Sequence, residues 1–404
     1  MKSNYKKLGQ YIRQVDVRNT EGKEENLLGV SVQKMFIPSI ANTVGTDFTK
    51  YKVVKKGQFT YIPDTSRRGD KIGIALLTDY EEGLVSNVYT VFEVIDEHEL
   101  IPEYLMLWFS RPEFDRYARF KSHGSVREVM DWDELCKVEL PVPTYEEQKR
   151  IVDSYKTITE RIALKQKIND NLQQQAQAIF KEWFIDNPDN VNWSNSTFSE
   201  LIQSTLSGDW GKEVPTGNHT EKVYCVRGAD IPEVKVGNKG KMPTRYILPK
   251  NYNSKKLTTG DIVVEISGGS PTQSTGRCTA ISESLLNRYD SGMVCTNFCR
   301  AIKPISGYSM FIYYYWQYLY DKGVFFSYEN GTTGIKNLDI AGFLGTEPIV
   351  IPPKEKVLAF DDYCQTIFDE IFANGKESEQ LSHLRDILLP KLISGELDVS
   401  DIEF

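Results

Sequence analysis

The chain has 404 residues, 40% of them hydrophobic and 26% charged, with a formal net charge of −8. This length exceeds what one hydrophobic core usually supports, so we expect two domains, or two domains and a connector. No apolar run approaches the roughly 20 residues of a membrane span, and no secretory signal opens the chain, which predicts a cytoplasmic protein that does not cross a membrane. The negative net charge does not exclude binding to nucleic acid, because most of the excess negative charge lies in one segment. Residues 351–404 hold 5 basic and 12 acidic side chains, whereas residues 190–350 hold 16 basic and 14 acidic ones.

Residues 1–142 are expected to form a mixed α+β domain. Strand-like runs such as Lys52–Val54 and Val88–Phe92 alternate there with turns rich in glycine and proline. Two groups of cations are candidate DNA-binding residues, because clustered cations are typical of phosphate contacts. The first group is Lys52, Lys55, Lys56, Arg67 and Arg68, and the second is Arg116, Arg119, Lys121 and Arg127. Tyr117 and Phe120 alternate with the second group, and they are more often core residues of a helix than base contacts.

Residues 143–189 predict one long helix. An apolar run closed by Pro143 precedes it, and proline fits the entry and first turn of a helix. Over 146–184 apolar residues recur every seven positions, which indicates a seam that packs against a partner helix. The seam residues are Ile151, Tyr155, Ile158, Ile162, Leu172 and Ile179. Lys165 and Asn169 make the middle heptad polar, and we expect them to set the register of the pair.

Residues 190–350 predict a second α+β domain, with a strand over Asp261–Val264. The densest basic run of the chain lies between positions 235 and 256, where no acidic residue occurs. Its candidate DNA-binding residues are Lys235, Lys239, Lys241, Arg245, Lys255 and Lys256, and Arg277 and Lys336 are added because they adjoin glycine-rich turns. A solvated surface run is the alternative explanation for such a cluster, but a basic stretch in an acidic protein favours phosphate.

Residues 351–404 repeat the pattern of residues 143–189. At a constant offset of 209 positions, Pro143 aligns with Pro352, Ile158 with Ile367, and further identities follow without a gap. The matching seam residues of this second helix are Phe360, Ile367, Ile371, Leu381 and Leu388. We expect Asn374-Gly375-Lys376 to break this helix and Pro390 to end it.

A repeat at half the chain length indicates a duplicated unit of one domain and one helix. We therefore predict an α+β protein with two globular domains separated by two long helices, which pack as an antiparallel coiled coil with a pseudo-two-fold internal repeat. The alternative is two separate amphipathic helices, each lying on its own domain. Because only the ends of the domains are recognisably duplicated, the sequence suggests a fixed frame that carries variable interiors.

Motifs for catalysis or metal binding are not found. The six cysteines are scattered, which fits neither a disulfide framework nor a zinc ribbon, so we expect reduced thiols packed as small apolar groups. No phosphate-binding loop occurs. Asn187-Pro188-Asp189-Asn190 lacks the second proline and the aromatic residue of adenine methyltransferases, and the glycines at 268 and 269 are better explained as a turn between strands. We predict no cofactor and no metal.

Three stretches near the ends of the two domains form a recognisable set: Leu140-Pro141-Val142-Pro143, Glu147-Gln148 before a long helix, and the run from Leu388 to Leu397. Together they resemble the conserved regions of type I restriction–modification specificity subunits. The resemblance covers the order of the whole chain: a target-recognition domain at 1–142, a central conserved helix at 143–189, a second target-recognition domain at 190–350, and a distal conserved helix at 351–404. One departure is that the second helix has Glu355-Lys356-Val357 in place of the Glu-Gln pair.

The resemblance implies a non-catalytic subunit that reads a bipartite site in double-stranded DNA. Its implied partners are two adenine methyltransferase (M) subunits and the ATP-dependent restriction (R) subunits, with each domain reading one half of the site and the helix pair fixing the unread spacer. Two other hypotheses remain at this point. The chain is a non-DNA scaffold or adaptor assembled through its paired helices, or it is an enzyme that acts alone.

Overall fold

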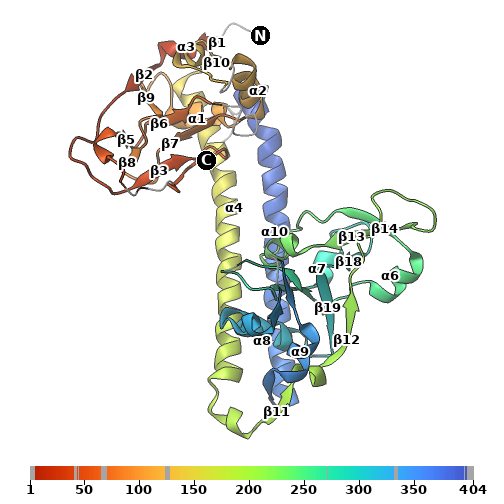
Figure 1. The fold of residues 1–404 in the computed structure, drawn as a ribbon. Coiled ribbons are helices and arrows are strands. Elements are labelled where there is room, and N and C mark those ends of the chain that lie inside the picture. Colours follow the sequence, from red (N-terminus) through yellow and green to blue (C-terminus); the bar gives the residue numbers. More distant parts are fainter. Residues whose placement is uncertain are drawn as a thin grey trace. The chain divides into compact units, whose positions relative to one another are not determined.

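The structure, a computed structural model, describes residues 5–40, 43, 45–64, 71–122, 128–270, 272–331, 335–394 and 396–397. The chain forms two compact units (Figure 1). Unit 1 comprises Met1–Glu160 and Ser382–Phe404, and unit 2 comprises Arg161–Leu381. Each unit thus contains a part of both long helices as well as one globular domain. The α+β class with two domains and two long helices, predicted from the sequence, is confirmed.

The described residues of unit 1 form three sheets. Its strands are β1 (Tyr5–Lys7), β2 (Ile12–Val15), β3 (Leu27–Val30), β4 (Phe36–Pro38), β5 (Lys52–Lys55), β6 (Phe59–Ile62), β7 (Gly73–Leu76), β8 (Glu82–Val85), β9 (Thr90–Val94) and β10 (Glu139–Pro141). The sheet orders are β2-β9-β6-β7, β4-β3-β8-β5 and β1-β10. Helices α1 (Pro102–Phe109), α2 (Pro112–Lys121) and α3 (Trp132–Cys136) complete the domain. The core gathers aromatic side chains, with Phe59 stacked on Phe92 at 4.9 Å between ring centroids.

In unit 2 the part of the chain that the structure describes forms four sheets, with the orders β12-β19-β15-β17, β14-β13-β18, β16-β21-β20 and β11-β22. Its strands are β11 (Ser194–Thr197), β12 (Ile202–Ser207), β13 (Glu221–Val226), β14 (Thr244–Ile247), β15 (Ile262–Glu265), β16 (Ser267–Gly268), β17 (Cys278–Ala280), β18 (Met293–Cys295), β19 (Cys299–Pro304), β20 (Glu329–Asn330), β21 (Lys336–Leu338) and β22 (Pro348–Ile351). Its short helices are α5 (Ile231–Lys235), α6 (Pro249–Lys255), α7 (Glu283–Leu286), α8 (Ser309–Asp321) and α9 (Ile340–Thr346). Helix α8 contributes a continuous row of buried aromatic residues to the core.

The two domains share part of their strand topology. In β2-β9-β6-β7 and in β12-β19-β15-β17, all neighbouring strands are antiparallel. In each sheet the strand that comes first in the chain, β2 or β12, pairs with the strand that comes last in the chain, β9 or β19. A second sheet in each unit joins one parallel pair, β3 with β8 or β13 with β18, to an antiparallel neighbour. In the short sheets β1-β10 and β11-β22, the strands β10 and β22 lie just before the long helices, at the offset of 209 positions. The duplication therefore includes the interiors, which the sequence suggested were variable.

The first long helix, α4, runs over Tyr145–Phe180 and continues as a π-helical turn over Lys181–Ile185. Its start is fixed by a reciprocal cap, in which the Thr144 backbone N–H donates to Glu147 at 2.9 Å and the Glu147 N–H donates to Thr144 Oγ1. Gln148 is fully buried and bonds the backbone of Glu99, Ile101 and Pro143. The Glu-Gln pair is thus a structural joint between domain and helix.

The second long helix, α10, runs unbroken over Lys354–Ser394. Both predicted interruptions are wrong. At Asn374-Gly375 the helix continues because Lys165 and Asn169 of α4 form hydrogen bonds with Asn374, and because the loop at Gly237 packs closely against Gly375. At Pro390 it continues for a further turn because Leu389, Leu392 and Ile393 pack into the core of unit 1, which offsets the hydrogen bond that proline cannot make.

The two long helices contact each other in both units (Figure 1). In unit 1 the start of α4, at Ile151, shares a core with Leu389 near the end of α10. In unit 2 the end of α4 meets the start of α10, with ring centroids of Phe180 and Phe360 5.8 Å apart. This order of contacts makes the pair antiparallel, as predicted. Both helices also pack into the domain cores, so pairing and packing on a domain occur together.

The predicted seam residues face inward to different degrees. Ile151, Ile162, Phe360, Ile367 and Ile371 are buried, whereas Tyr155, Ile158, Leu172, Ile179, Leu381 and Leu388 are half-buried. All six cysteines are free thiols, and five of them are buried. Among the helices of the described residues, none is long and apolar enough to cross a bilayer.

Candidate nucleic-acid interface

The basic run of unit 2 begins where α5 ends, and its backbone is held there by side chains from elsewhere. Three successive carbonyl oxygens accept hydrogen bonds: Lys235 O from Gln173 at 2.7 Å, Val236 O from Asn169 at 3.0 Å, and Gly237 O from Arg288 at 2.6 Å. Because two of these donors lie on α4, the long helix fixes the point from which the basic loop departs.

A close approach of two glycines fixes the same loop against α10. Gly237 has a positive φ of 86°, and a Cβ built on it would lie 2.3 Å from the carbonyl oxygen of Ile371. A Cβ on Gly375 would lie 1.9 Å from the carbonyl oxygen of Gly237. Only glycine fits at either position without a shift of the backbone.

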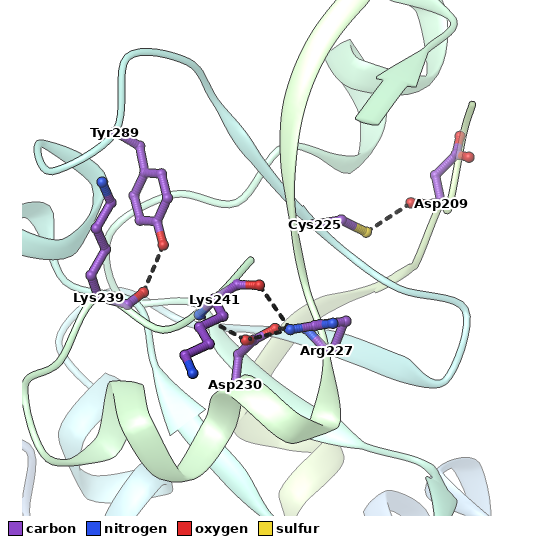
Figure 2. A network of polar contacts seen from close by, with 7 residues as sticks. All are labelled: Asp209, Cys225, Arg227, Asp230, Lys239, Lys241 and Tyr289. Atoms are coloured by element: carbon purple, nitrogen blue, oxygen red, sulfur yellow. Dashed lines mark hydrogen bonds and ion pairs between the residues drawn. The ribbon is translucent and has the colours of Figure 1, made fainter. Parts of the chain in front are cut away.

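Asp230 holds the second part of the loop (Figure 2). The Asp230 carboxylate is 2% exposed and accepts hydrogen bonds from the Lys241 backbone N–H at 3.0 Å and from the Arg227 guanidinium at 2.9 and 3.0 Å. Arg227 also donates a hydrogen bond to the Lys241 carbonyl at 2.8 Å. The hydrogen bonds from Arg227 to Asp230 raise the pKa of Arg227. Tyr289 donates to the Lys239 carbonyl at 2.6 Å. The backbone at 239–241 is thus rigidly placed while its ammonium groups are left for other partners.

Among the predicted cations of unit 2, those without an ion pair to any described residue are Lys235, Lys239 and Lys241 at this loop and Lys256 after α6. Lys241 and Lys256 are exposed, and within the described residues their ammonium groups have no hydrogen bond or ion pair. The ammonium of Lys239 lies 4.6 Å from the ring centroid of Tyr289, a contact that leaves it accessible for an anion. Lys235 is half-buried at the start of the run. Free ammonium groups on a fixed backbone suit electrostatic binding of phosphate.

Four other predicted residues of unit 2 are engaged inside the protein. Arg277 forms two bonds of 2.7 Å to Glu265, which raise the pKa of Arg277. The other three contacts are Arg245 with Glu213 at 2.9 Å and over the ring of Trp210 at 3.8 Å, Lys255 with the Gly208 carbonyl at 2.9 Å, and Lys336 with Glu329 at 2.8 Å. These side chains reach DNA only by giving up those partners.

In unit 1 the predicted residues are divided in the same way. Lys55 is exposed, with no side-chain bond to any described residue, and Lys121 lies 5.9 Å from the ring of Tyr117. Four others have internal partners: Lys52 bonds the Tyr89 carbonyl, Lys56 pairs with Glu81, Arg116 pairs with Glu113, and Arg119 pairs with Glu128. Arg67, Arg68 and Arg127 lie outside the described residues.

The sequence did not single out the residues that position the basic loop. Asn169 was expected only to set helix register, and Gln173, Asp230 and Arg288 were not considered. Asp230 bonds the Lys241 backbone 11 residues away and Asn169 bonds the Val236 carbonyl 67 residues away, so no local pattern connects them. Arg111 was also overlooked, because it stands alone between two short helices. The signal available in the sequence was the glycine at 237, which the structure shows with a positive φ just after the end of α5.

Comparison with known proteins gives one consistent result. Residues 2–174 match the family model of the type I restriction modification DNA specificity domain. The chain is 26% identical over 326 residues to the type I restriction enzyme MjaIX specificity subunit of Methanocaldococcus jannaschii, covering 76% of this chain and 72% of that protein. It is 22% identical over 415 residues to the HindI specificity subunit of Haemophilus influenzae, covering 86% and 88%.

The fold is shared with a solved structure as well. The crystal structure of the type I restriction–modification S subunit from M. genitalium superposes with a TM-score of 0.55 at 14% identity, and it covers 98% of this chain and 96% of that one. Together these matches confirm the resemblance to type I specificity subunits that the sequence predicts.

Proposed function

We propose that this chain, which resembles type I specificity subunits in sequence and shares the fold of one, is the sequence-specific DNA-binding subunit of a type I restriction–modification complex. Each domain reads one half of a bipartite site in double-stranded DNA, and the paired helices fix the spacer between the halves. The chain itself has no catalytic role. It directs two adenine methyltransferase subunits, and the ATP-dependent restriction subunits, to the site in the cytoplasm.

The observation that carries this proposal is the fixed basic loop of unit 2. Its backbone is bonded by Asn169, Gln173, Arg288 and Asp230, while Lys239 and Lys241 keep their charges available. A loop ordered before binding loses little entropy when it meets the phosphate backbone. Phosphate contacts of this kind position a protein on the duplex, and other side chains then read base edges.

The test is DNA binding by the chain assembled with its methyltransferase partner, measured over a salt series. Neutralisation of phosphates predicts that the logarithm of the affinity falls linearly with the logarithm of the salt concentration, with a slope of about −0.9 for each phosphate contacted. Assembly without binding to any duplex would support the scaffold hypothesis instead. Methyl transfer or cleavage by the purified chain alone would show that it is an enzyme.

A further inference from the structure

Arg111 is a buried cation without a counter-ion. It lies between α1 and α2, is 9% exposed, and its guanidinium carbon stands 3.6 Å from the centroid of the Trp108 ring. Its hydrogen bond to the protein is a long one of 3.4 Å, from Nε to the Trp108 carbonyl. Throughout the described part of the chain, no carboxylate pairs with Arg111 and no acceptor bonds its terminal nitrogens. Arginine is almost never this buried unless it is paired.

A hollow of about 370 Å³ opens beside Arg111. Trp108, Tyr117 and Phe114 form apolar parts of its wall, and Lys121 and Lys137 add two further cations. Two carboxylates also line it. Glu113 is paired with Arg116 at 2.9 Å, while Glu139 is exposed; Lys137 is paired with Glu134 at 2.6 Å. Arg111 and Lys121 therefore remain as two cations against the single carboxylate of Glu139.

Trp108 supplies a second donor without an acceptor. Its indole Nε1 is buried and has no hydrogen-bond partner among the described residues. A buried donor left unsatisfied costs about 1–3 kcal/mol, so native structures seldom keep one without a reason. Burial lowers the pKa of Arg111, and attraction to Glu113 offsets this only in part. The terminal nitrogens of Arg111 and the indole Nε1 of Trp108 are thus neighbouring donors without an acceptor in the described residues.

We propose that this hollow, the Arg111 pocket, is an oxyanion-binding site, and that its occupant in the complex is a backbone phosphate of the DNA. The inference rests on the proposed function. Phosphate is favoured over a carboxylate because two cations, Arg111 and Lys121, line the pocket, and the closely spaced negative charges of the duplex backbone suit a paired cationic site. Arg116 and Arg119 of α2 are engaged with carboxylates of their own and are not counted. The stacked guanidinium is held in one orientation before binding, and its terminal nitrogens give the bidentate contact that phosphate accepts.

The first experiment uses inorganic phosphate as the probe on the full chain in its methyltransferase complex. A ligand that binds only the folded state raises its melting temperature in a concentration-dependent way. We expect phosphate to raise the melting temperature of the wild type and of Arg13→Met by more than that of Arg111→Met, which keeps only the general stabilisation by phosphate and binding at the basic loop of unit 2. Arg13 is an exposed residue of β2 paired with Glu93, so its substitution makes the same change of charge away from the pocket. An equal response of the wild type and Arg111→Met would overturn the oxyanion site.

The second experiment measures DNA affinity against salt for the same variants, on a duplex that contains the site mapped from methylated adenines in the host genome. Arg111→Met should reduce the magnitude of the slope by about 0.9, and Arg13→Met should leave it unchanged. Lys121→Ala, at the half-buried rim, gives the same test if Arg111→Met fails to fold. Unchanged slopes in both pocket variants would overturn the DNA assignment, as would loss of methyltransferase binding with the slope retained. If the wild type itself shows no salt-dependent DNA binding, the proposed function is wrong. The effect of phosphate on the melting temperature still shows whether the Arg111 pocket binds an oxyanion.

Discussion

A basic side chain contributes to DNA binding only as far as its charge is free. At the residue scale, the structure separates the predicted cations into two classes on this basis. Lys241 and Lys256 are exposed without a partner in the described residues, whereas Arg277 and Lys336 already bond carboxylates. The first class offers full charges to phosphate. The second class must break an internal ion pair before it binds.

Lys241→Ala should weaken DNA binding without harming the fold. The side chain is exposed, while the backbone of residue 241 keeps its bonds to Asp230 and Arg227. We expect the salt slope to shrink by about 0.9, the value of one phosphate contact, for every duplex sequence alike. Lys322→Ala is the control, since Lys322 is a lysine of the same unit that contacts the ring of Tyr318 outside the basic run. Equal slopes for the two variants would remove Lys241 from the interface.

Arg277→Met should instead destabilise unit 2. Glu265 is 7% exposed and would lose its only cationic partner in the described structure, which leaves a buried carboxylate unpaired. Breaking such a pair costs about 3 kcal/mol, visible as a lower midpoint of urea unfolding. The double variant Arg277→Met with Glu265→Leu should recover most of the loss, and exposed Lys256→Met should show none. A single variant as stable as the wild type would contradict this role.

The sequence predicted where cations cluster but not which of them are free. The run 235–256 is a local property, readable from composition alone. Partnership is not local: Arg245 bonds Glu213, which lies in a separate loop, and Arg277 bonds Glu265 across two strands. Arg111 was missed for the opposite reason. It stands outside any cluster, and its significance comes from burial on Trp108, which only packing creates.

At the element scale, heptad spacing was sufficient to predict both long helices and their pairing. The polar heptad was also informative, since Asn374 donates to Asn169 at 2.9 Å and accepts from Lys165 at 2.7 Å. The expected break at Asn374-Gly375 failed because propensity describes an isolated helix. Here tertiary bonds hold the asparagine, and the approach of Gly237 requires the glycine.

Gly375→Ala should therefore be destabilising although alanine is the better helix former. Its Cβ would stand 1.9 Å from the Gly237 carbonyl oxygen, and relieving such an overlap costs about 1–3 kcal/mol. The matched control is Gly345→Ala in α9, where a Cβ meets nothing within 4 Å and should stabilise by about 0.5–1 kcal/mol. The two urea midpoints should move in opposite directions from the wild type. A gain in both variants would show that α10 and the loop at Gly237 do not touch.

Glu377 should make the helix pair sensitive to acid. Hydrogen bonds from Lys165 and then Arg161 lower the pKa of Glu377 below its ordinary 4.5. For a carboxyl whose folded pKa is depressed, the stabilisation is complete above the unfolded pKa and is lost as the pH falls through the folded one. Wild type should thus lose more unfolding free energy between pH 7 and the region below pH 4.5 than Glu377→Gln. Glu370→Gln, exposed on the same helix, should behave as wild type; a loss in Glu377→Gln equal to that of wild type would refute the linkage.

At the scale of the whole molecule, the sequence showed duplication at the ends of the domains and hid it in their interiors. The two repeats keep identical residues where the backbone conformation is restricted. Pro143 and Pro352 are examples, since each leads from a short strand into a long helix. Inside the domains a strand needs only the right alternation of apolar and polar residues. Unrelated residues can therefore give the same strand order, and the shared topology of the two units became visible only in three dimensions.

The duplicated frame predicts how the spacer of the DNA site is set. In the proposed function the paired helices fix the spacer, so lengthening both of them should lengthen it. Insertion of one heptad between Glu160 and Arg161, with another between Leu381 and Ser382, enters at the boundaries of the two units and preserves the seam. Each helix grows by about 10 Å at 1.5 Å per residue, which corresponds to about three base pairs.

Mapping of methylated adenines in cells that carry this double insertion is expected to find both half-sequences unchanged, with about three more base pairs between them. Insertion into α4 alone is the control. The α4 and α10 seams then differ by a heptad, so the helix pairs of the two units can no longer both keep their register, and methylation or assembly should be abolished. The original spacing with full methylation in the double insertion would show that something other than the helix pair measures the spacer, because the helices would then have changed length without effect.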